Sequence, residues 1–219
     1  MSSTAESHVA RKTAVTTHSR LSRAAMTAVV AVGVLAALAR TLSAQTAAPQ
    51  PATWELRFTS GGLVPTGAER STIKDAQYSA AQVSWLVMPS VAITSTFGWG
   101  RSRDIATNGD PQLDVFTYDL GAEARGGQWF TGKTMTFSPF VGAGAGARSY
   151  NYRNLDVDAT HNIAGYAAAG GELAAGRVGV RLEVRDYVAG FKPLVGGGPA
   201  STRNDVVIMV GLRFRKSAE

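Results

Sequence analysis

The final strand-like segment of the chain, residues 205–215, alternates between two kinds of side chain. One face carries the apolar residues Val206, Ile208, Val210, Leu212 and Phe214. The other carries Asp205, Gly211, Arg213 and Arg215, with Val207 and Met209 between them. Because side chains point to opposite faces of a strand with period two, this pattern predicts a strand with one apolar and one more polar face. Its length is that of a tilted strand that crosses a bilayer.

The same alternation recurs along the chain from residue 53 onward. Strand-like segments are expected around residues 54–59, 81–87, 91–99, 116–125, 137–148, 162–173, 178–185 and 205–215. The sixth is rich in alanine and glycine, so the sequence does not decide which of its residues face the lumen. No stretch after residue 44 shows sustained helical periodicity. Eight amphipathic strands in one domain predict an all-β fold, a single eight-stranded antiparallel up-and-down transmembrane β-barrel.

The connections between these segments differ in length in a regular way. Short turns are expected at residues 88–90 and 174–177. Longer connections are expected at residues 60–76, 101–111, 151–160 and 189–204, and the stretch 126–134 breaks the rule by being fairly long. Short turns on one side and long loops on the other are typical of bacterial outer-membrane barrels, and an even strand count places both termini in the periplasm.

Alternation alone also fits a soluble lipocalin-like barrel, whose apolar face points inward. Lysine placement favours the membrane barrel, because all five lysines (Lys12, Lys74, Lys133, Lys192 and Lys216) fall outside the predicted strands. A confined lumen favours arginine, whose planar guanidinium pairs with carboxylates. The polar face is predicted to form a structural network of nearly balanced charge, consisting of Glu55, Arg57, Asp119, Glu123, Arg125, Arg181, Glu183, Arg185, Asp205 and Arg213.

The first 44 residues are predicted to be a secretory signal peptide. A basic leader precedes an apolar run, residues 24–39, which is short for a spanning helix, and Leu42-Ser43-Ala44 offers a cleavage position. An uncleaved anchor is the alternative. Residues 45–52 are expected to be a linker and residues 53–216 the barrel. The leader holds five basic residues against Glu6, so the net charge of +6 falls to +2 in the rest of the chain. A nucleic-acid partner is therefore not expected.

Several aromatic residues are expected to form girdles at the two membrane interfaces. They lie near predicted strand ends or connections: Trp54, Trp85, Trp99, Trp129, Phe130 and Phe191. Interfacial girdles use aromatic rings because one end is apolar and the other contacts water.

The chain resembles the small bacterial outer-membrane β-barrel family, which includes opacity-type porins and the transmembrane domain of OmpA. The resemblance rests on the secretion signal, on Gly61-Gly62-Leu63-Val64-Pro65-Thr66-Gly67 and on Val180-Arg181-Leu182-Glu183-Val184-Arg185-Asp186-Tyr187. It implies localisation in the outer membrane, contact with outer-membrane lipids and insertion by the barrel-assembly machinery. In this family a terminal aromatic residue often directs assembly; here Phe214 could serve, although five residues follow it.

No catalytic, cofactor-binding or metal-binding residues are predicted. The segment Phe140–Ala147 loosely matches a dinucleotide fingerprint, but strand-like residues follow it where that motif requires a helix. We therefore expect a strand whose inward glycines make room for bulky lumen side chains. His161 is the only histidine after the leader, and Ile163 stands where enzymes of the lipid A deacylase type have a serine. A base–nucleophile pair at His161 is therefore not expected.

The leading hypothesis is a structural or surface-interaction protein of the outer membrane that is not an enzyme. An eight-stranded barrel is just wide enough for side chains to fill its interior. A narrow porin or transporter for small solutes is the alternative, favoured if the inward glycines leave a continuous water path. A lipid-modifying barrel enzyme is the remote alternative.

Overall fold

The computed structural model describes residues 53–127, 130–131, 134–153, 155–191 and 201–216. The predicted signal peptide and linker lie outside these residues. The strands are β1 (Thr53–Thr66), β2 (Ala76–Met88), β3 (Val91–Arg103), β4 (Gln112–Arg125), β5 (Phe130–Thr131), β6 (Thr136–Tyr152), β7 (Thr160–Ala175), β8 (Val178–Phe191) and β9 (Ser201–Arg215). A short 3-10 helix, η1, spans Gly67–Ser71. No helix among the described residues is long and apolar enough to span a membrane.

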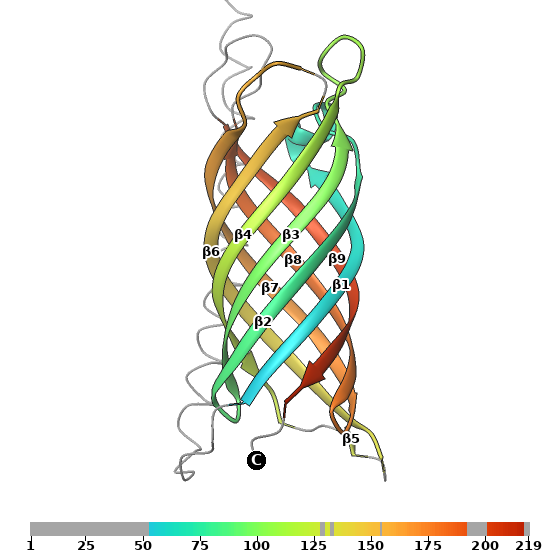
Figure 1. The fold of residues 1–219 in the computed structure, drawn as a ribbon, viewed down its shortest axis with the longest axis vertical. Helices are drawn as coiled ribbons and strands as arrows, with labels where there is room; N and C mark the ends of the chain where they lie inside the picture. Colours follow the sequence, from blue (N-terminus) through green and yellow to red (C-terminus); the bar gives the residue numbers. More distant parts are fainter. Residues whose placement is uncertain (1–52, 128–129, 132–133, 154, 192–200, 217–219) are drawn as a thin grey trace, which may run out of the picture. The chain divides into compact units, whose positions relative to one another are not determined.

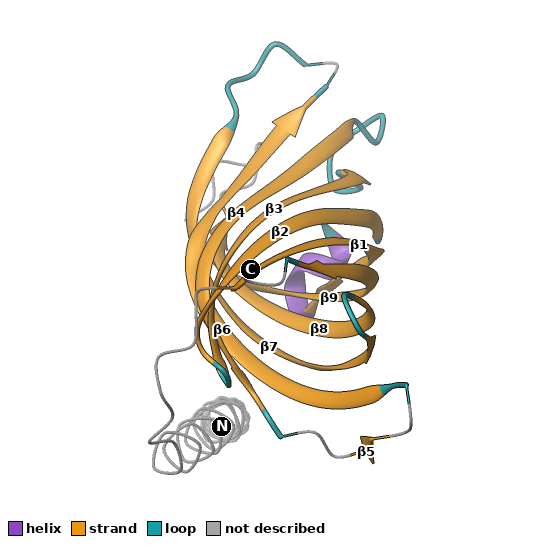
Figure 2. Ribbon diagram, turned by 60° about the horizontal axis from the view of Figure 1, so that its bottom comes forward, coloured by secondary structure: helices purple, strands orange, loops and turns teal. Residues whose placement is uncertain are grey.

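Eight long strands form a closed antiparallel barrel, as the sequence predicts (Figure 1). Each strand pairs with its neighbours in the ring order β1-β2-β3-β4-β6-β7-β8-β9, β1 pairs with β9, and β4 pairs with β6. The two-residue strand β5 pairs only with β6 and lies outside the ring (Figure 2). Since every other strand is paired on both sides, the barrel has no open edge.

The two ends of the barrel differ in their connections. At one end, the turn end, two residues join β2 to β3 and two join β7 to β8, as predicted. The described chain also begins and finishes there, because the Lys216 amide donates to the Trp54 carbonyl at 3.0 Å. The opposite end, the loop end, carries the connections that follow β1, β3 and β6 and is at the top of Figure 1; β8 also ends there.

The strands extend further toward the loop end than the sequence predicts. β1 continues to Thr66 instead of ending before residue 60, so the segment Gly61–Thr66 belongs to the strand. β3, β6 and β8 also run past their predicted ends, and β9 begins at Ser201. The prediction was wrong here because inward residues near the loop end, such as Leu63, are apolar, whereas outward residues, such as Arg101 and Arg103, are charged. The contrast between the two faces, on which the strand prediction depends, is therefore reversed there.

The outer face of the barrel is a broad apolar surface. Leu182 is 56% exposed, and the same face of β8 exposes the valines at positions 178, 180, 184 and 188. In the predicted sixth strand, now β7, Ile163 points outward and is 87% exposed, whereas Tyr166 and Glu172 are buried inside. The open question of its facing is thus resolved. Exposed apolar side chains around a closed barrel are those of a lipid-facing band.

Aromatic side chains lie on the outer face near both ends of the barrel. Trp54 and Trp85, from neighbouring strands at the turn end, stack with their ring centroids 5.5 Å apart. Trp99 lies in the loop-end half of β3, beneath the Arg101 guanidinium at 4.6 Å. These three positions agree with interfacial girdles. The backbone of Trp129 and the side chains of Phe130 and Phe191 lie outside the described part of the chain.

Candidate functional site

The charged residues predicted to face the lumen are all buried inside the barrel. Each of the ten is at most 9% exposed, although alternate positions on the same strands are lipid-facing. They come from β1, β4, β8 and β9, and the antiparallel registers bring these strands around one interior. The structure therefore places every predicted lumen residue on the predicted face.

Glu123 on β4 is the centre of a set of ion pairs that crosses the lumen. It lies 3.2 Å from Arg57 on β1, 2.8 Å from Arg125 on its own strand and 2.6 Å from Arg181 on β8. Both β1 and β8 are three positions away from β4 around the ring. These contacts therefore connect strands that are not neighbours, and they occupy the space between them.

Glu55 on β1 forms a second centre close to the turn end. Its carboxylate accepts hydrogen bonds from Arg57 at 2.9 Å, from Arg125 at 3.0 Å and from Arg215 at 2.7 Å. Arg213 lies 3.6 Å from the same carboxylate. Charge-assisted hydrogen bonds of this kind are about twice as strong as neutral ones.

The network continues along β8 toward the middle of the barrel. Glu183 pairs with Arg181 at 2.9 Å and with Arg185, and Arg185 lies 3.4 Å from Asp119. The Tyr187 hydroxyl donates to Asp119 at 2.6 Å. Nine of the ten predicted residues thus belong to one continuous network, and Asp205 is the exception.

Two charges outside the predicted network pair with members of it. Arg148 on β6 is the ion-pair partner of Asp205, and Glu172 on β7 lies 3.0 Å from Arg213. Period two would have assigned Glu172 to the lumen, since it lies six residues beyond Tyr166 on the same face. The intervening alanines and glycines are too small and too similar to show which residues of this strand face inward.

The loop-end half of the lumen is filled differently from the prediction. The Arg–carboxylate network fills the turn-end half, whereas the other half holds, beside the Arg148–Asp205 pair, a cluster of tyrosines and aliphatic side chains. The cluster comprises Leu63, Ile73, Ala76, Tyr78, Ala80, Leu113, Val115, Tyr150, Tyr152, Tyr166, Tyr187, Val207 and Met209. The predicted Arg–carboxylate network is therefore present, and this apolar cluster is a second filling of the lumen that the prediction did not include. In the sequence, the apolar residues Val207 and Met209 on the polar face of the last strand were the sign that apolar side chains enter the lumen.

Tyrosine rings occupy the space that inward glycines leave. A Cβ atom on Gly98 would collide with the Tyr78 hydroxyl, which forms a 2.6 Å hydrogen bond with Thr117. A Cβ atom on Gly144 would lie 2.6 Å from the Tyr166 ring. Within residues 140–147, Gly144 thus makes room for a bulky lumen side chain as expected, and that segment is a strand throughout.

Outside the lumen, the structure corrects the expectation for His161. The Ser149 hydroxyl lies 2.6 Å from His161 Nδ1, because residues 149 and 161 are partners in the β6–β7 ladder. The pair is near the loop end of the barrel. Sequence spacing could not reveal it, since the two residues are on different strands. No group of three or more metal-ligating side chains occurs in the part of the chain that the structure describes.

No protein-family model and no curated protein sequence matches this chain. Among solved structures it is similar to Neisserial surface protein A (NspA), with a TM-score of 0.52 and 10% sequence identity over 75% of this chain and 99% of that one. It is also similar to the outer membrane protein OprG from Pseudomonas aeruginosa, with a TM-score of 0.52 and 11% identity over 78% of this chain and 98% of that one. The chain thus shares the fold of small outer-membrane β-barrel proteins.

Proposed function

We propose that the protein is an integral outer-membrane β-barrel with a closed lumen and a structural or surface-interaction role. The observation that carries this proposal is the network through which Glu123 joins Arg57 and Arg181 across the lumen. Buried charges held in this way fix strands that are not neighbours, so they brace the barrel. The exposed apolar band on the outside supports residence in a membrane.

The contents of the lumen favour a closed barrel over a narrow porin. The porin alternative requires a water path along the inward glycines. Tyr78 and Tyr166 fill the space beside Gly98, Gly121 and Gly144, and salt bridges cross the turn-end half. A solute would have to displace both the tyrosine rings and the salt bridges, and breaking buried ion pairs is costly.

Conductance in planar bilayers tests the closed lumen. The purified full-length barrel is expected to insert without producing discrete open steps. A parallel gel assay, in which unheated folded barrel migrates differently from heated protein, confirms that the inserted sample is folded. Stable current steps from folded protein would make the narrow porin the leading function.

The remaining parts of the proposal concern location and partners. The apolar band is in contact with outer-membrane lipids, the barrel-assembly machinery inserts the chain, and the loop-end connections meet partners outside the cell. Membrane fractionation of cells depleted of the assembly machinery provides the test. The protein should then leave the outer-membrane fraction and accumulate unfolded. Unchanged amounts of folded barrel would contradict machinery-dependent insertion.

A lipid-modifying enzyme is the second candidate, because Ser149 and His161 are within hydrogen-bonding distance. A histidine beside a serine hydroxyl can act as general base for nucleophilic attack on an ester. No carboxylate orients this ring among the described residues, so a non-enzymatic role is our first proposal. Release of fatty acid from lipid vesicles by the wild-type protein, abolished by Ser149→Ala and unaffected by Ser60→Ala, would establish the enzyme instead.

A further inference from the structure

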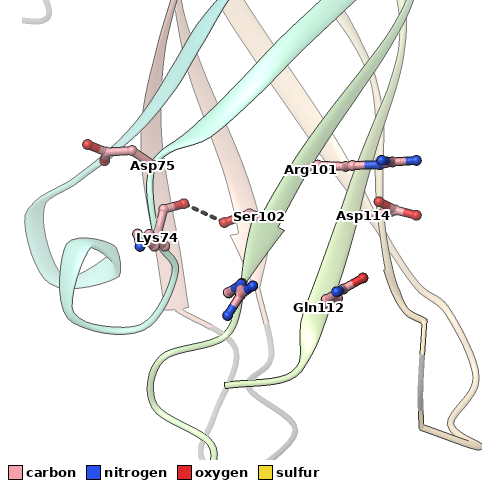
Figure 3. Close-up of a pocket in the computed structure, with 7 residues that line it drawn as sticks. Lys74, Asp75, Arg101, Ser102, Gln112 and Asp114 are labelled. Atoms are coloured by element: carbon pink, nitrogen blue, oxygen red, sulfur yellow. Dashed lines mark hydrogen bonds between the residues drawn. The ribbon is translucent and has the colours of Figure 1, made fainter. Parts of the chain in front are cut away.

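Three cationic side chains surround a pocket at the loop end of the barrel. Lys74 lies just before β2, and Arg101 and Arg103 lie on β3; all three line a pocket of about 340 Å³ (Figure 3). Asp75, Ser102, Gln112 and Asp114 complete the lining.

The two arginines belong to the outer face of the barrel. Arg101 and Arg103 are exposed, whereas the alternate residues Ser102 and Asp104 are buried. The Arg101 guanidinium also lies 4.6 Å from the ring of Trp99, two residues closer to the apolar band on the same face. A tryptophan in this position marks the level where a membrane meets water. The cations therefore lie where lipid headgroups are found.

The positive charge of this pocket is not neutralised within the barrel. Asp114 is held by Arg153 at 2.6 Å, so its charge is already paired. Asp75 is the only other carboxylate in the lining. Within the described ranges Lys74, Arg101 and Arg103 form no ion pair, in contrast to the arginines of the lumen. Three cations thus share one unpaired carboxylate.

The backbone that carries these cations is well ordered by hydrogen bonds. The Lys74 amide donates to the Arg103 carbonyl at 3.0 Å, and the Ser102 hydroxyl donates to the Lys74 carbonyl (Figure 3). Beyond β3, Asp104 accepts hydrogen bonds from the Ala106 amide at 3.0 Å and from the Tyr152 hydroxyl at 2.8 Å. The backbone positions of the three cationic residues are therefore set by the fold.

We propose that this pocket binds the phosphate group of a phosphorylated lipid headgroup in the external leaflet of the membrane. Guanidinium groups bind phosphate oxygens through paired hydrogen bonds, and an ammonium adds a point charge. The inference rests on the proposed function, because it requires the barrel to span a membrane with its loop end outside. Since the arginines face away from the lumen, a headgroup anchored beside Trp99 can reach them directly.

Native mass spectrometry of the full-length barrel in neutral detergent tests the proposal. The probe is lipid A carrying two phosphates, compared with the same lipid after enzymatic removal of both phosphates. We expect the double variant Arg101→Gln/Arg103→Gln to bind the phosphorylated lipid about tenfold more weakly than the wild type. The matched control, Arg177→Gln/Lys216→Gln, removes two positive charges at the turn end and should bind like the wild type.

Three outcomes would overturn the site: equal binding of the two lipids by the wild type, unchanged binding by the double variant, or an equal loss in the control. Displacement of the lipid by an equal concentration of inorganic phosphate would show a site for a soluble anion and would also overturn it. Folding of the barrel itself is tested separately, by insertion into neutral phosphatidylcholine vesicles without lipid A. Folded, unheated barrel should then migrate on a gel differently from heated protein. If the barrel folds in these vesicles but binds the two forms of lipid A equally well, this inference is refuted and the proposed function stays intact.

Discussion

Arg181 on β8 donates a hydrogen bond of 2.6 Å to Glu123 on β4, across the interior of the barrel. The same carboxylate also pairs with Arg57 on β1. The Glu123 side chain therefore links β4 to β1 and to β8, two strands with which β4 forms no backbone hydrogen bonds. Because the three side chains are almost completely buried, water cannot replace a lost partner at little cost.

Replacing the central carboxylate should destabilise the barrel strongly. Glu123→Gln leaves Arg57 and Arg181 without their shared counter-charge, and breaking such a buried pair costs about 3–5 kcal/mol. Glu183→Gln, further along β8, should also cost clearly more than the roughly 1 kcal/mol of a surface pair, or open a measurable conductance. Guanidinium unfolding in detergent, followed by tryptophan fluorescence, gives these free energies.

The exposed carboxylate Asp75 supplies the control for this series. Asp75→Asn should change the free energy of unfolding by no more than about 0.5 kcal/mol. If Glu183→Gln alters neither stability nor conductance, the interior is wet and unpaired, and the narrow porin becomes the better interpretation.

The depth of a residue on the lipid face should determine the cost of a charge. Leu182 lies near the middle of the exposed apolar stretch of β8, which runs from Val178 to Val188. Leu182→Arg should therefore lower the free energy of unfolding by about 2–4 kcal/mol in lipid vesicles. Val178 is on the same face at the turn end, and Val178→Arg should cost only about 0–1 kcal/mol. Equal costs at the two depths would argue against a membrane-spanning barrel.

Removing an aromatic ring from the lumen should loosen its loop-end half. Tyr166 fills the space beside Gly121 and Gly144, so Tyr166→Ala creates a void next to two residues that cannot fill it. We expect a loss of about 3–5 kcal/mol, as for other large-to-small changes in a packed interior. Tyr118 is an outward tyrosine on β4, and Tyr118→Ala should cost less. A similar loss in both variants would show that Tyr166 is not tightly packed.

The assignment of the two barrel ends can be tested with single cysteines, because the natural chain has none. Asn108→Cys lies in the connection between β3 and β4 at the loop end and should react with an impermeant thiol reagent on intact cells. Arg177→Cys lies in the turn between β7 and β8 and should react only after the outer membrane is opened. The opposite labelling pattern would reverse the proposed topology. Residues 192–200 and 217–219 lie outside the described residues, so the two cysteines are placed elsewhere.

The sequence by itself determined the strand type, the number of barrel strands and the inward position of the charged side chains. A period of two is a local property of the backbone, so Arg181, Glu183 and Arg185 had to share a face whatever the tertiary structure. The short turns were equally visible in the sequence. The strand ends near the loops were not, because there inward residues such as Leu63 are apolar and outward residues such as Arg101 are charged.

Only the tertiary structure decided which side chains meet. Closure of the ring brings Glu123 between Arg57 and Arg181, and it leaves Asp205 with Arg148 instead. Register between strands placed Ser149 beside His161, although a long connection separates them in sequence. Such pairings depend on the stagger of a closed barrel, a collective property of all its strands that no single segment encodes. Local alternation therefore sets the face of each residue, and barrel closure selects its partner.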